Sequence, residues 1–202
     1  MTNHYFSQTP GSESDPRFWE YTLKGRKFRF KTDTGVFSKK EVDFGSRLLI
    51  ETFESPEVEG PFLDAGCGYG PIGLSIASAF PDRTVHMIDV NQRALSLAKE
   101  NAALNQIGNV KIYESDRLEE VNEQGFAAVL TNPPIRAGKK VVFDFFHQSY
   151  EKLAEGGALW VVIQKKQGAP SALKEIESLF GNAEMIDRSK GYYIIKAEKV
   201  DS

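Results

Sequence analysis

Hydrophobic positions change their spacing at regular intervals along this chain, and the changes predict alternating strands and helices. Short apolar runs that stop at glycine, aspartate or asparagine predict buried strands, and segments with helical spacing separate them. The predicted core strands are 61–66, 84–90, 110–116, 126–134, 158–164, 184–188 and 191–199. The predicted helices between them are 71–80, 91–105, 139–154 and 171–180. This alternation is typical of an α/β fold with a mostly parallel sheet and helices on both faces.

The segment before this core follows a different pattern. Its opening residues are polar and predict a loose arm. Aromatic residues alternate with lysine and arginine over 21–31, which predicts an antiparallel strand with a turn at its start. A short helix is predicted over 43–53. We expect residues 1–58 to form an arm, a hairpin and a helix packed on a core of residues 59–202, in one structural unit.

Composition narrows the class of protein. A chain of 202 residues with 41% hydrophobic and 26% charged residues is globular and close to one domain in size. Its longest apolar stretch, 158–163, is far shorter than the roughly 20 residues of a membrane span, so we expect no membrane partner. The N-terminus lacks the features of a secretory signal, and Cys67 is the only cysteine. We therefore expect a cytoplasmic protein without a disulfide or a metal site.

A glycine-rich turn follows the first core strand. Asp64 precedes glycines at 66, 68 and 70, and a helix is predicted directly after them. In a parallel α/β sheet, ligands bind at the edge formed by the carboxyl ends of the strands, where this turn is predicted to lie. The spacing from Gly68 to Gly73 matches the dinucleotide fingerprint GxGxxG. Directly after the strand, however, the pattern is GxGxG, and the Asp64 carboxylate would repel a pyrophosphate. A cationic ligand fits this carboxylate better.

S-adenosylmethionine (SAM) is such a ligand, because it carries an ammonium and a sulfonium group and no phosphate. In this interpretation Asp64 lines the aminocarboxypropyl end of SAM. Asp89, after the second core strand, accepts the ribose hydroxyls with its two carboxylate oxygens. Asp116, after the third strand, accepts the adenine amine. The candidate cofactor-binding residues at these strand ends are Asp64, Gly66, Gly68, Asp89, Asn91, Asp116 and Arg117.

Asn132, Pro133 and Pro134 end another apolar strand and are the candidate catalytic residues. Proline restricts the residue before it, so we expect Asn132 to be extended, with its side-chain oxygen and a neighbouring carbonyl directed into the pocket. An exocyclic NH2 group is a poor nucleophile because its lone pair is delocalised. Two acceptors for its N–H groups favour a pyramidal nitrogen and stabilise the positive charge that develops there. Correct placement of the nitrogen supplies much of the remaining rate.

Taken together, these residues resemble the class I SAM-dependent methyltransferases. LDAGCGYGPIG (63–73) resembles motif I, and HMIDVN (86–91), ESD (114–116) and NPPI (132–135) resemble motifs II, III and IV. GVFSKKEVDFGSRLLIE (35–51) resembles the segment before motif I in the methyltransferase small domain of small-subunit ribosomal RNA guanine-N2 methyltransferases, in their single-domain form. The resemblance implies a Rossmann-like fold with a mostly parallel seven-stranded sheet and SAM as cofactor. It also implies that Phe37, Ser38 and Lys39 lie near the methionine end of SAM.

Charge and resemblance together predict ribosomal RNA, or a ribosomal subunit, as the partner. The net charge of -3 requires any surface for nucleic acid to be local. Basic residues follow two core strands and should reach one edge of the sheet, and others lie on the N-terminal hairpin. Ile135 stands where amine methyltransferases commonly have a Tyr or Phe that stacks on the target ring, so either Phe37 stacks there or the substrate is held differently. The candidate substrate-binding residues are Arg29, Ile135, Arg136, Lys139, Lys165 and Lys166.

The leading hypothesis is a SAM-dependent N-methyltransferase that acts on the N2 amine of guanine in ribosomal RNA. The nearest alternative is a protein glutamine or DNA adenine N-methyltransferase, because both substrates offer the same kind of amine. More remote alternatives are a dinucleotide-dependent oxidoreductase and a non-catalytic SAM-binding subunit or RNA-binding module. The sequence does not determine the oligomeric state.

Overall fold

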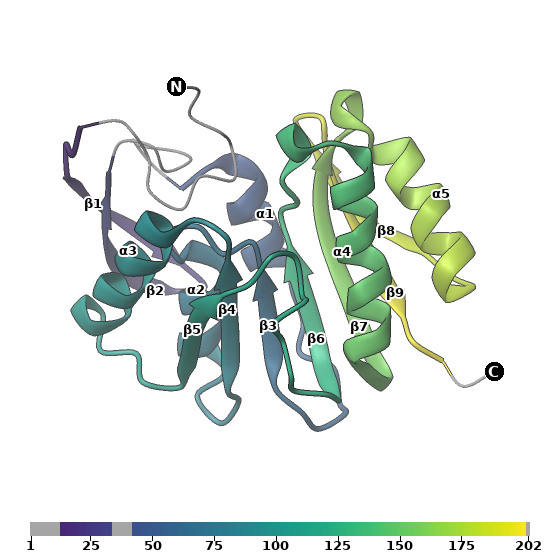
Figure 1. Cartoon of the computed structure of the whole chain (residues 1–202), viewed down its shortest axis with the longest axis horizontal. Coiled ribbons are helices and arrows are strands. Elements are labelled where there is room, and N and C mark those ends of the chain that lie inside the picture. Colours follow the sequence, from purple (N-terminus) through teal and green to yellow (C-terminus); the bar gives the residue numbers. More distant parts are fainter. Residues whose placement is uncertain (1–12, 34–41, 201–202) are drawn as a thin grey trace.

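A seven-stranded sheet forms the centre of the computed structural model, which describes residues 13–33 and 42–200 (Figure 1). The strand order is β5-β4-β3-β6-β7-β9-β8. Strands β3 to β7 run parallel, and β9 runs antiparallel to both of its neighbours. The strands are β3 (Phe62–Ala65), β4 (Val85–Asp89), β5 (Val110–Glu114), β6 (Phe126–Thr131), β7 (Leu153–Gln164), β8 (Glu184–Ser189) and β9 (Tyr192–Glu198). This confirms the predicted Rossmann-like fold with a mostly parallel sheet.

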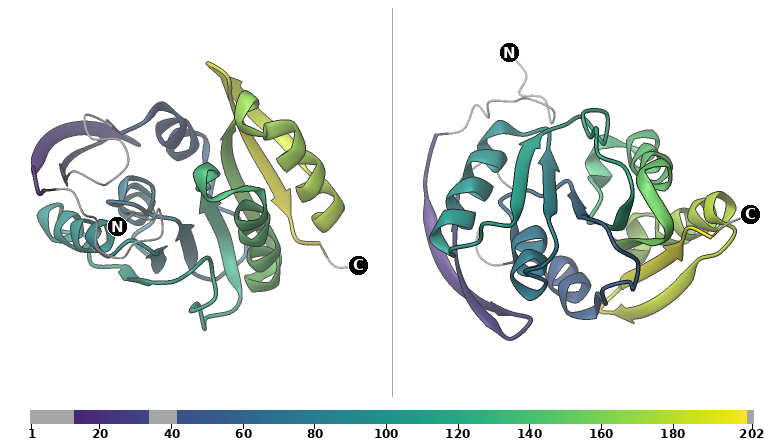
Figure 2. Two further views of the ribbon diagram at one scale, coloured as in Figure 1. Left: turned by 45° about the horizontal axis from the view of Figure 1, so that its top comes forward. Right: turned by 90° about the horizontal axis from the view of Figure 1, so that it is seen from below.

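Helices cover both faces of the sheet (Figure 2). Those on one face are α1 (Phe44–Thr52), α2 (Pro71–Ala79) and α3 (Gln92–Leu104), and those on the other are α4 (Lys139–Lys152) and α5 (Ala169–Phe180). Two short 3-10 turns, η1 (Ile135–Ala137) and η2 (Lys165–Gln167), follow β6 and β7. Asn91 caps α3 by accepting a hydrogen bond from the Ala94 N–H at 3.1 Å, as the sequence predicts. β6 ends at Thr131 rather than at 134, because prolines 133 and 134 have no N–H to continue the ladder.

A separate two-stranded sheet lies outside α3. It is formed by β1 (Arg17–Leu23) and β2 (Arg26–Thr32), joined at the predicted turn, where Lys24 and Gly25 have φ angles of 46° and 75°. Asn101 of α3 and Asn105, the C-cap residue of α3, bind the backbone of β2 as a neighbouring strand would. Asn105 accepts a hydrogen bond from the Arg29 N–H at 3.0 Å and donates one to its carbonyl at 2.8 Å, and Asn101 does the same for Lys31.

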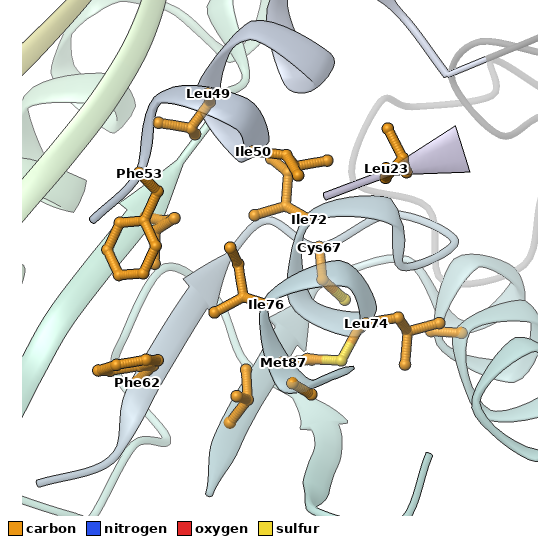
Figure 3. Packing of buried hydrophobic residues seen from close by; sticks show 14 of the residues in the cluster. Leu23, Leu49, Ile50, Phe53, Phe62, Cys67, Ile72, Leu74, Ile76 and Met87 are labelled. Carbon is orange, nitrogen blue, oxygen red and sulfur yellow. The ribbon is translucent and has the colours of Figure 1, made fainter. Parts of the chain in front are cut away.

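The hairpin and α1 share one hydrophobic core with α2 and α3 (Figure 3). Phe53, the C-cap residue of α1, packs edge-on against Phe62 of β3, with ring centroids 5.5 Å apart, and Phe28 of the hairpin is fully buried in the same cluster. The boundary at residue 58 stays a prediction, because this packing is continuous across it. Within the described residues, no helix is both long and apolar enough to cross a membrane.

Candidate functional site

The turn after β3 presents an open backbone surface at the upper edge of the sheet in Figure 1. Gly66 and Gly68 have φ angles of +81° and +56°, in the left-handed region that favours glycine. A Cβ added at either glycine would meet no described atom within 4 Å. The Gly66 N–H donates to the Ile88 carbonyl at 2.9 Å, so the turn is anchored to β4. Side chains at these two positions would therefore project into open space where a ligand fits.

Asp64 carries a buried carboxylate beneath this turn. Its Oδ2 accepts a hydrogen bond from the Gly73 N–H at 2.8 Å, whereas its Oδ1 has no hydrogen-bond partner among the described residues. Burial raises the pKa of Asp64 to about 7, the Gly73 bond opposes the rise, and the negative charge of Asp89 adds to it. A buried acceptor without a donor is costly, so this oxygen favours a cationic or hydrogen-bonding ligand.

Asp89 lies at the end of β4, beside the glycine turn. Its Oδ2 accepts from the Gly68 N–H at 2.8 Å and its Oδ1 from the Asn91 N–H at 2.9 Å. Burial raises the pKa of Asp89, and these backbone bonds oppose the rise. Each carboxylate oxygen can accept a second hydrogen bond, so the residue remains able to bind hydroxyl groups. The Asn91 Oδ1 caps α3 by accepting from the Ala94 N–H. The predicted contact of Asn91 with the cofactor stays a prediction.

Asp116 and Arg117 follow β5, as predicted, and Arg117 is tied to α4. The Arg117 guanidinium lies 2.7 Å from the Asp144 carboxylate and 3.5 Å from that of Asp116. The next residue, Leu118, is buried, and its N–H donates to Gln148 at 2.8 Å. The loop is therefore held in place by α4. The adenine contacts of Asp116 and Arg117 stay predictions.

Asn132 lies on the other side of the glycine turn from Asp89. Ala65 pairs with Ile88 of β4 and with Thr131 of β6. The residues that come next in the three strands, Gly66, Asp89 and Asn132, therefore lie side by side at one edge. The sequence hypothesis requires this arrangement, because the cofactor and the target amine must meet.

The Asn132 amide is held from the other direction by the N-terminus of α1. Its Nδ2 donates to the Ser46 Oγ at 3.1 Å and lies 3.4 Å from the Asp43 Oδ1. Sequence reasoning did not connect these residues, since Asn132 and Ser46 are 86 positions apart. Phe37 and Lys39 lie outside the described residues.

Most predicted substrate residues lie at the same edge. Ile135 and Arg136 lie in η1, and Lys139 is the first residue of α4. Arg136 and Lys139 are exposed, whereas Ile135 packs partly buried against the core formed with α4 and α5. Ile135 therefore does not extend freely as a stacking side chain.

A hollow of about 520 Å³ lies beside the end of β7. Its lining residues are Gln164, Lys165, Lys166, Pro170, Lys190 and Gly191. Sequence reasoning missed Lys190, although it follows a predicted late strand. β8 is parallel to β7, because both run antiparallel to β9, so the residue after β8 reaches the same edge. Three lysines therefore line one hollow near the candidate catalytic loop.

Arg29 does not join this group. Its backbone bonds to Asn105, which lies at the end of α3 away from the site, and its guanidinium lies 5.0 Å from the centre of the Phe18 ring. The neighbouring Arg26 donates to Ser78 and to the Asn105 carbonyl. β2 packs along α3, so Arg26 and Arg29 lie at the end of that helix that is far from the site. Lys31 lies nearer, beside Asn101, which also donates to the Tyr69 carbonyl in the glycine turn. We leave Arg29 out of the candidate substrate surface.

A second hollow, of about 440 Å³, lies at the opposite edge, where β3, β4 and β5 begin. Arg83, one of its lining residues, donates its guanidinium N–H groups to the carbonyls of Val58, Gly60 and Pro56. Its charge is thus committed to the backbone. This edge is also not where parallel α/β sheets bind ligands, so we do not place the site there.

The raised pKa of Asp64 predicts a measurable dependence of stability on pH. Between pH 4 and about 7 the folded chain holds a proton at Asp64 that the unfolded chain has lost, so the Asp64 contribution to the free energy of unfolding falls as pH rises. Asp64→Asn cannot titrate. From pH 5 to pH 8, we expect the free energy of unfolding of the variant to rise by about 2–4 kcal/mol relative to that of wild type. Denaturant unfolding at both pH values measures this, with exposed Asp82→Asn as control. If the difference in free energy of unfolding between Asp64→Asn and wild type is the same at both pH values, the raised pKa is wrong.

Comparisons with known proteins agree with this geometry. The family model of the methyltransferase small domain matches residues 27–196. A Bacillus subtilis (strain 168) protein named uncharacterized protein YbxB is 60% identical over 99% of this chain and 100% of its own length. The ribosomal RNA small subunit methyltransferase C of Colwellia psychrerythraea is 32% identical over 89% of this chain, which spans 50% of that protein.

A solved structure shows the same fold. The T. thermophilus 16S rRNA N2 G1207 methyltransferase, in complex with AdoMet and guanosine, superposes with a TM-score of 0.82 at 24% identity. The match covers 95% of this chain and 52% of that one, so the chain spans about half the length of these ribosomal RNA methyltransferases. The oxidoreductase and non-catalytic alternatives find no support in these matches. The chain belongs to the methyltransferase small domain family, and it is a SAM-dependent methyltransferase.

Proposed function

We propose that this chain transfers the methyl group of SAM to the exocyclic N2 amine of a guanine in ribosomal RNA. The observation that carries the proposal is the position of Asp89 and Asn132 on the two sides of the glycine turn. A surface suited to a cationic nucleoside and an acceptor suited to an NH2 group thus share one edge of the sheet.

The residues at the turn fit SAM, which supplies an electrophilic methyl group on its sulfonium when bound. We assign its binding to Asp64, Gly66, Gly68, Asp89 and Asp116. The unpartnered Asp64 oxygen and the open side of the turn support this assignment. Both are features that a purely structural strand-to-helix turn does not need.

Asn132 and the Pro133 carbonyl are assigned to the target amine. Their oxygens accept its two N–H groups, which leaves the nitrogen lone pair directed at the methyl carbon. The same oxygens stabilise the positive charge that develops on nitrogen as the bond forms. The extra proton leaves to water after transfer, so no side chain has to act as a base.

Guanine in ribosomal RNA is favoured as substrate by two observations. The relatives named above are ribosomal RNA methyltransferases, and the T. thermophilus name specifies N2 of a guanine. The lysines that line the hollow after β7 provide positive charge beside the candidate catalytic loop. Because this chain spans half the length of those relatives, the substrate is our proposal and requires its own test.

The test uses the purified chain, labelled SAM, and ribosomal RNA, DNA or protein as acceptor. We expect label in the RNA, and N2-methylguanosine when the RNA is digested to nucleosides and analysed by mass spectrometry. A matched transcript with inosine in place of guanosine lacks the 2-amine and should take no label. Label in glutamine or in DNA adenine would support the alternative substrates. Equal labelling of the inosine transcript would exclude the N2 amine.

The lysine-lined hollow leads to a prediction about RNA affinity. We expect Lys165→Gln combined with Lys190→Gln to weaken RNA binding and to lower the slope of log K against log salt by about 1–2, since each lysine contacts about one phosphate. SAM affinity should not change. Lys111→Gln, in the hollow at the opposite edge, is the matched control. An unchanged salt slope in the double variant would place the RNA elsewhere.

A further inference from the structure

The N-terminus of α1 holds the Asn132 amide in one orientation, and this contact suggests a role for two residues. We propose that Asp43 and Ser46 are positioning residues that determine which end of the Asn132 amide faces the substrate amine. The inference rests on the proposed function, because it concerns the same acceptor. The family resemblance of residues 35–51 implies a role at the methionine end of SAM. The role proposed here, in orienting the Asn132 amide, is a different one.

The carboxylate of Asp43 determines which atoms donate and which accept in this group of hydrogen bonds. A carboxylate can only accept hydrogen bonds. The Oδ1 of Asp43 accepts from the Ser46 N–H at 3.0 Å, and its Oδ2 accepts from the Ser46 hydroxyl at 2.8 Å. The single hydroxyl hydrogen of Ser46 is therefore committed to Asp43. The Ser46 Oγ is left to act only as an acceptor.

Asn132 completes the series. Its Nδ2 donates to the Ser46 Oγ at 3.1 Å and approaches the Asp43 Oδ1 at 3.4 Å. A reversed amide would place the Asn132 oxygen against two oxygens that have no hydrogen to offer, and these would repel it. Because the amide is planar, binding its nitrogen on the α1 side directs its oxygen away from α1. That oxygen is the one that an NH2 substrate requires.

The anchor itself is held in place. Ser46 is buried, and Asp43 caps α1 through the Ser46 N–H. The Tyr192 ring of β9 packs directly on Gly45, where an added Cβ would lie 2.6 Å from the ring. Phe44 contacts the same ring, with centroids 5.7 Å apart. The start of α1 is thus held against the sheet, so a hydrogen bond to it restrains Asn132.

A loss of this orientation should act on turnover and leave cofactor binding intact. A reversed Asn132 amide would present N–H groups to the N–H groups of the substrate, and the acceptor would be lost. SAM is assigned to the turn after β3, which Asp43 and Ser46 do not contact through any described hydrogen bond. The proposal therefore predicts a lower kcat with unchanged SAM affinity.

Asp43→Asn is the sharpest test, because asparagine caps helices as well as aspartate does. Its new NH2 group can donate to the Ser46 Oγ, which frees the serine hydrogen and permits the reversed Asn132 amide. We expect kcat to fall about 10- to 100-fold, with the SAM dissociation constant within about twofold of wild type. Ser46→Ala should act in the same direction. Ser46→Thr, which keeps a hydroxyl, should restore most of the activity.

Two measurements separate positioning from a general loss of structure. Ser149→Ala removes another buried helical hydroxyl, which donates to the Phe145 carbonyl, and should leave kcat unchanged. The side-chain NH2 signals of Asn132 in NMR spectra, assigned by their loss in Asn132→Ala, report the contact without any turnover. We expect their protection from exchange in wild type and its loss in Ser46→Ala.

The outcomes separate this inference from the proposed function. Wild-type kcat in Asp43→Asn and Ser46→Ala, with Asn132→Ala inactive, would overturn the positioning role and leave the function intact. Unprotected Asn132 NH2 signals in the wild type would also overturn it, whatever the substrate. If SAM affinity falls in parallel with kcat, Asp43 and Ser46 serve the cofactor instead. If the wild type methylates no guanine amine, the proposed function fails, and the NMR comparison still decides the orientation.

Discussion

Replacing Asn132 with alanine is expected to lower kcat by about 100- to 1,000-fold, the effect of removing one preorganised polar contact from a reacting group. The side chain lies at the end of β6 beside Gly66, and its Nδ2 is held by Ser46. Its loss would leave the target nitrogen without a fixed acceptor. SAM affinity should stay unchanged, because the residues assigned to SAM belong to other strand ends. Single-turnover kinetics and calorimetric titration with SAM measure the two quantities.

Asn122→Ala provides the control for this prediction. Asn122 is exposed in the segment between β5 and β6, so its loss should affect neither kcat nor SAM binding. Full turnover by Asn132→Ala would remove Asn132 from the mechanism. A matching loss of SAM affinity would instead show that Asn132 belongs to the cofactor site.

Replacing Asp89 with alanine is expected to weaken SAM binding by about 1–3 kcal/mol, or about 5- to 150-fold in the dissociation constant. The sequence predicts the loss of contacts to the ribose. The structure adds a second cause, because Asp89 also accepts the Gly68 and Asn91 N–H groups and so supports the glycine turn. Asp89→Asn retains an acceptor oxygen for one of these N–H groups and should show a smaller loss. Calorimetry with SAM distinguishes the two variants.

Asp82→Ala serves as the control for Asp89, since Asp82 is an exposed aspartate in the hollow at the opposite edge of the sheet. Its SAM affinity should equal that of wild type. An unchanged dissociation constant in Asp89→Ala would refute the ribose assignment. A loss in both variants would point to the overall negative charge of the protein rather than to a specific contact.

Local patterns predicted the elements that carry the site. Asn91 caps a helix and proline 71 opens one, and the strand before the glycines is fully buried, because capping, proline geometry and apolar runs act over a few residues. The strand that begins at Phe126 ends earlier than predicted, because the two prolines of the motif also end its backbone hydrogen bonding to the neighbouring strands. Each of these features depends on side chains close together in the sequence.

Contacts between distant segments were predicted less well. Arg29 was expected near the site, but Asn105 holds its part of β2 at the far end of α3. Nothing in the alternation of Phe28 and Phe30 with charged residues indicates which helix the hairpin packs on. Lys190 was missed for a similar reason, because its position follows from the direction of β8 beside β9.

The sequence by itself determined the α/β class, the glycine turn after Asp64, and the asparagine before two prolines. These follow from spacing and from backbone chemistry that a few neighbouring residues decide. Only the tertiary structure decided that Asp89 and Asn132 flank that turn, and that Ser46 holds the Asn132 amide. Strand order and helix docking bring together residues that are far apart in the chain. The spacing of hydrophobic residues within a segment does not specify which distant segment it will contact.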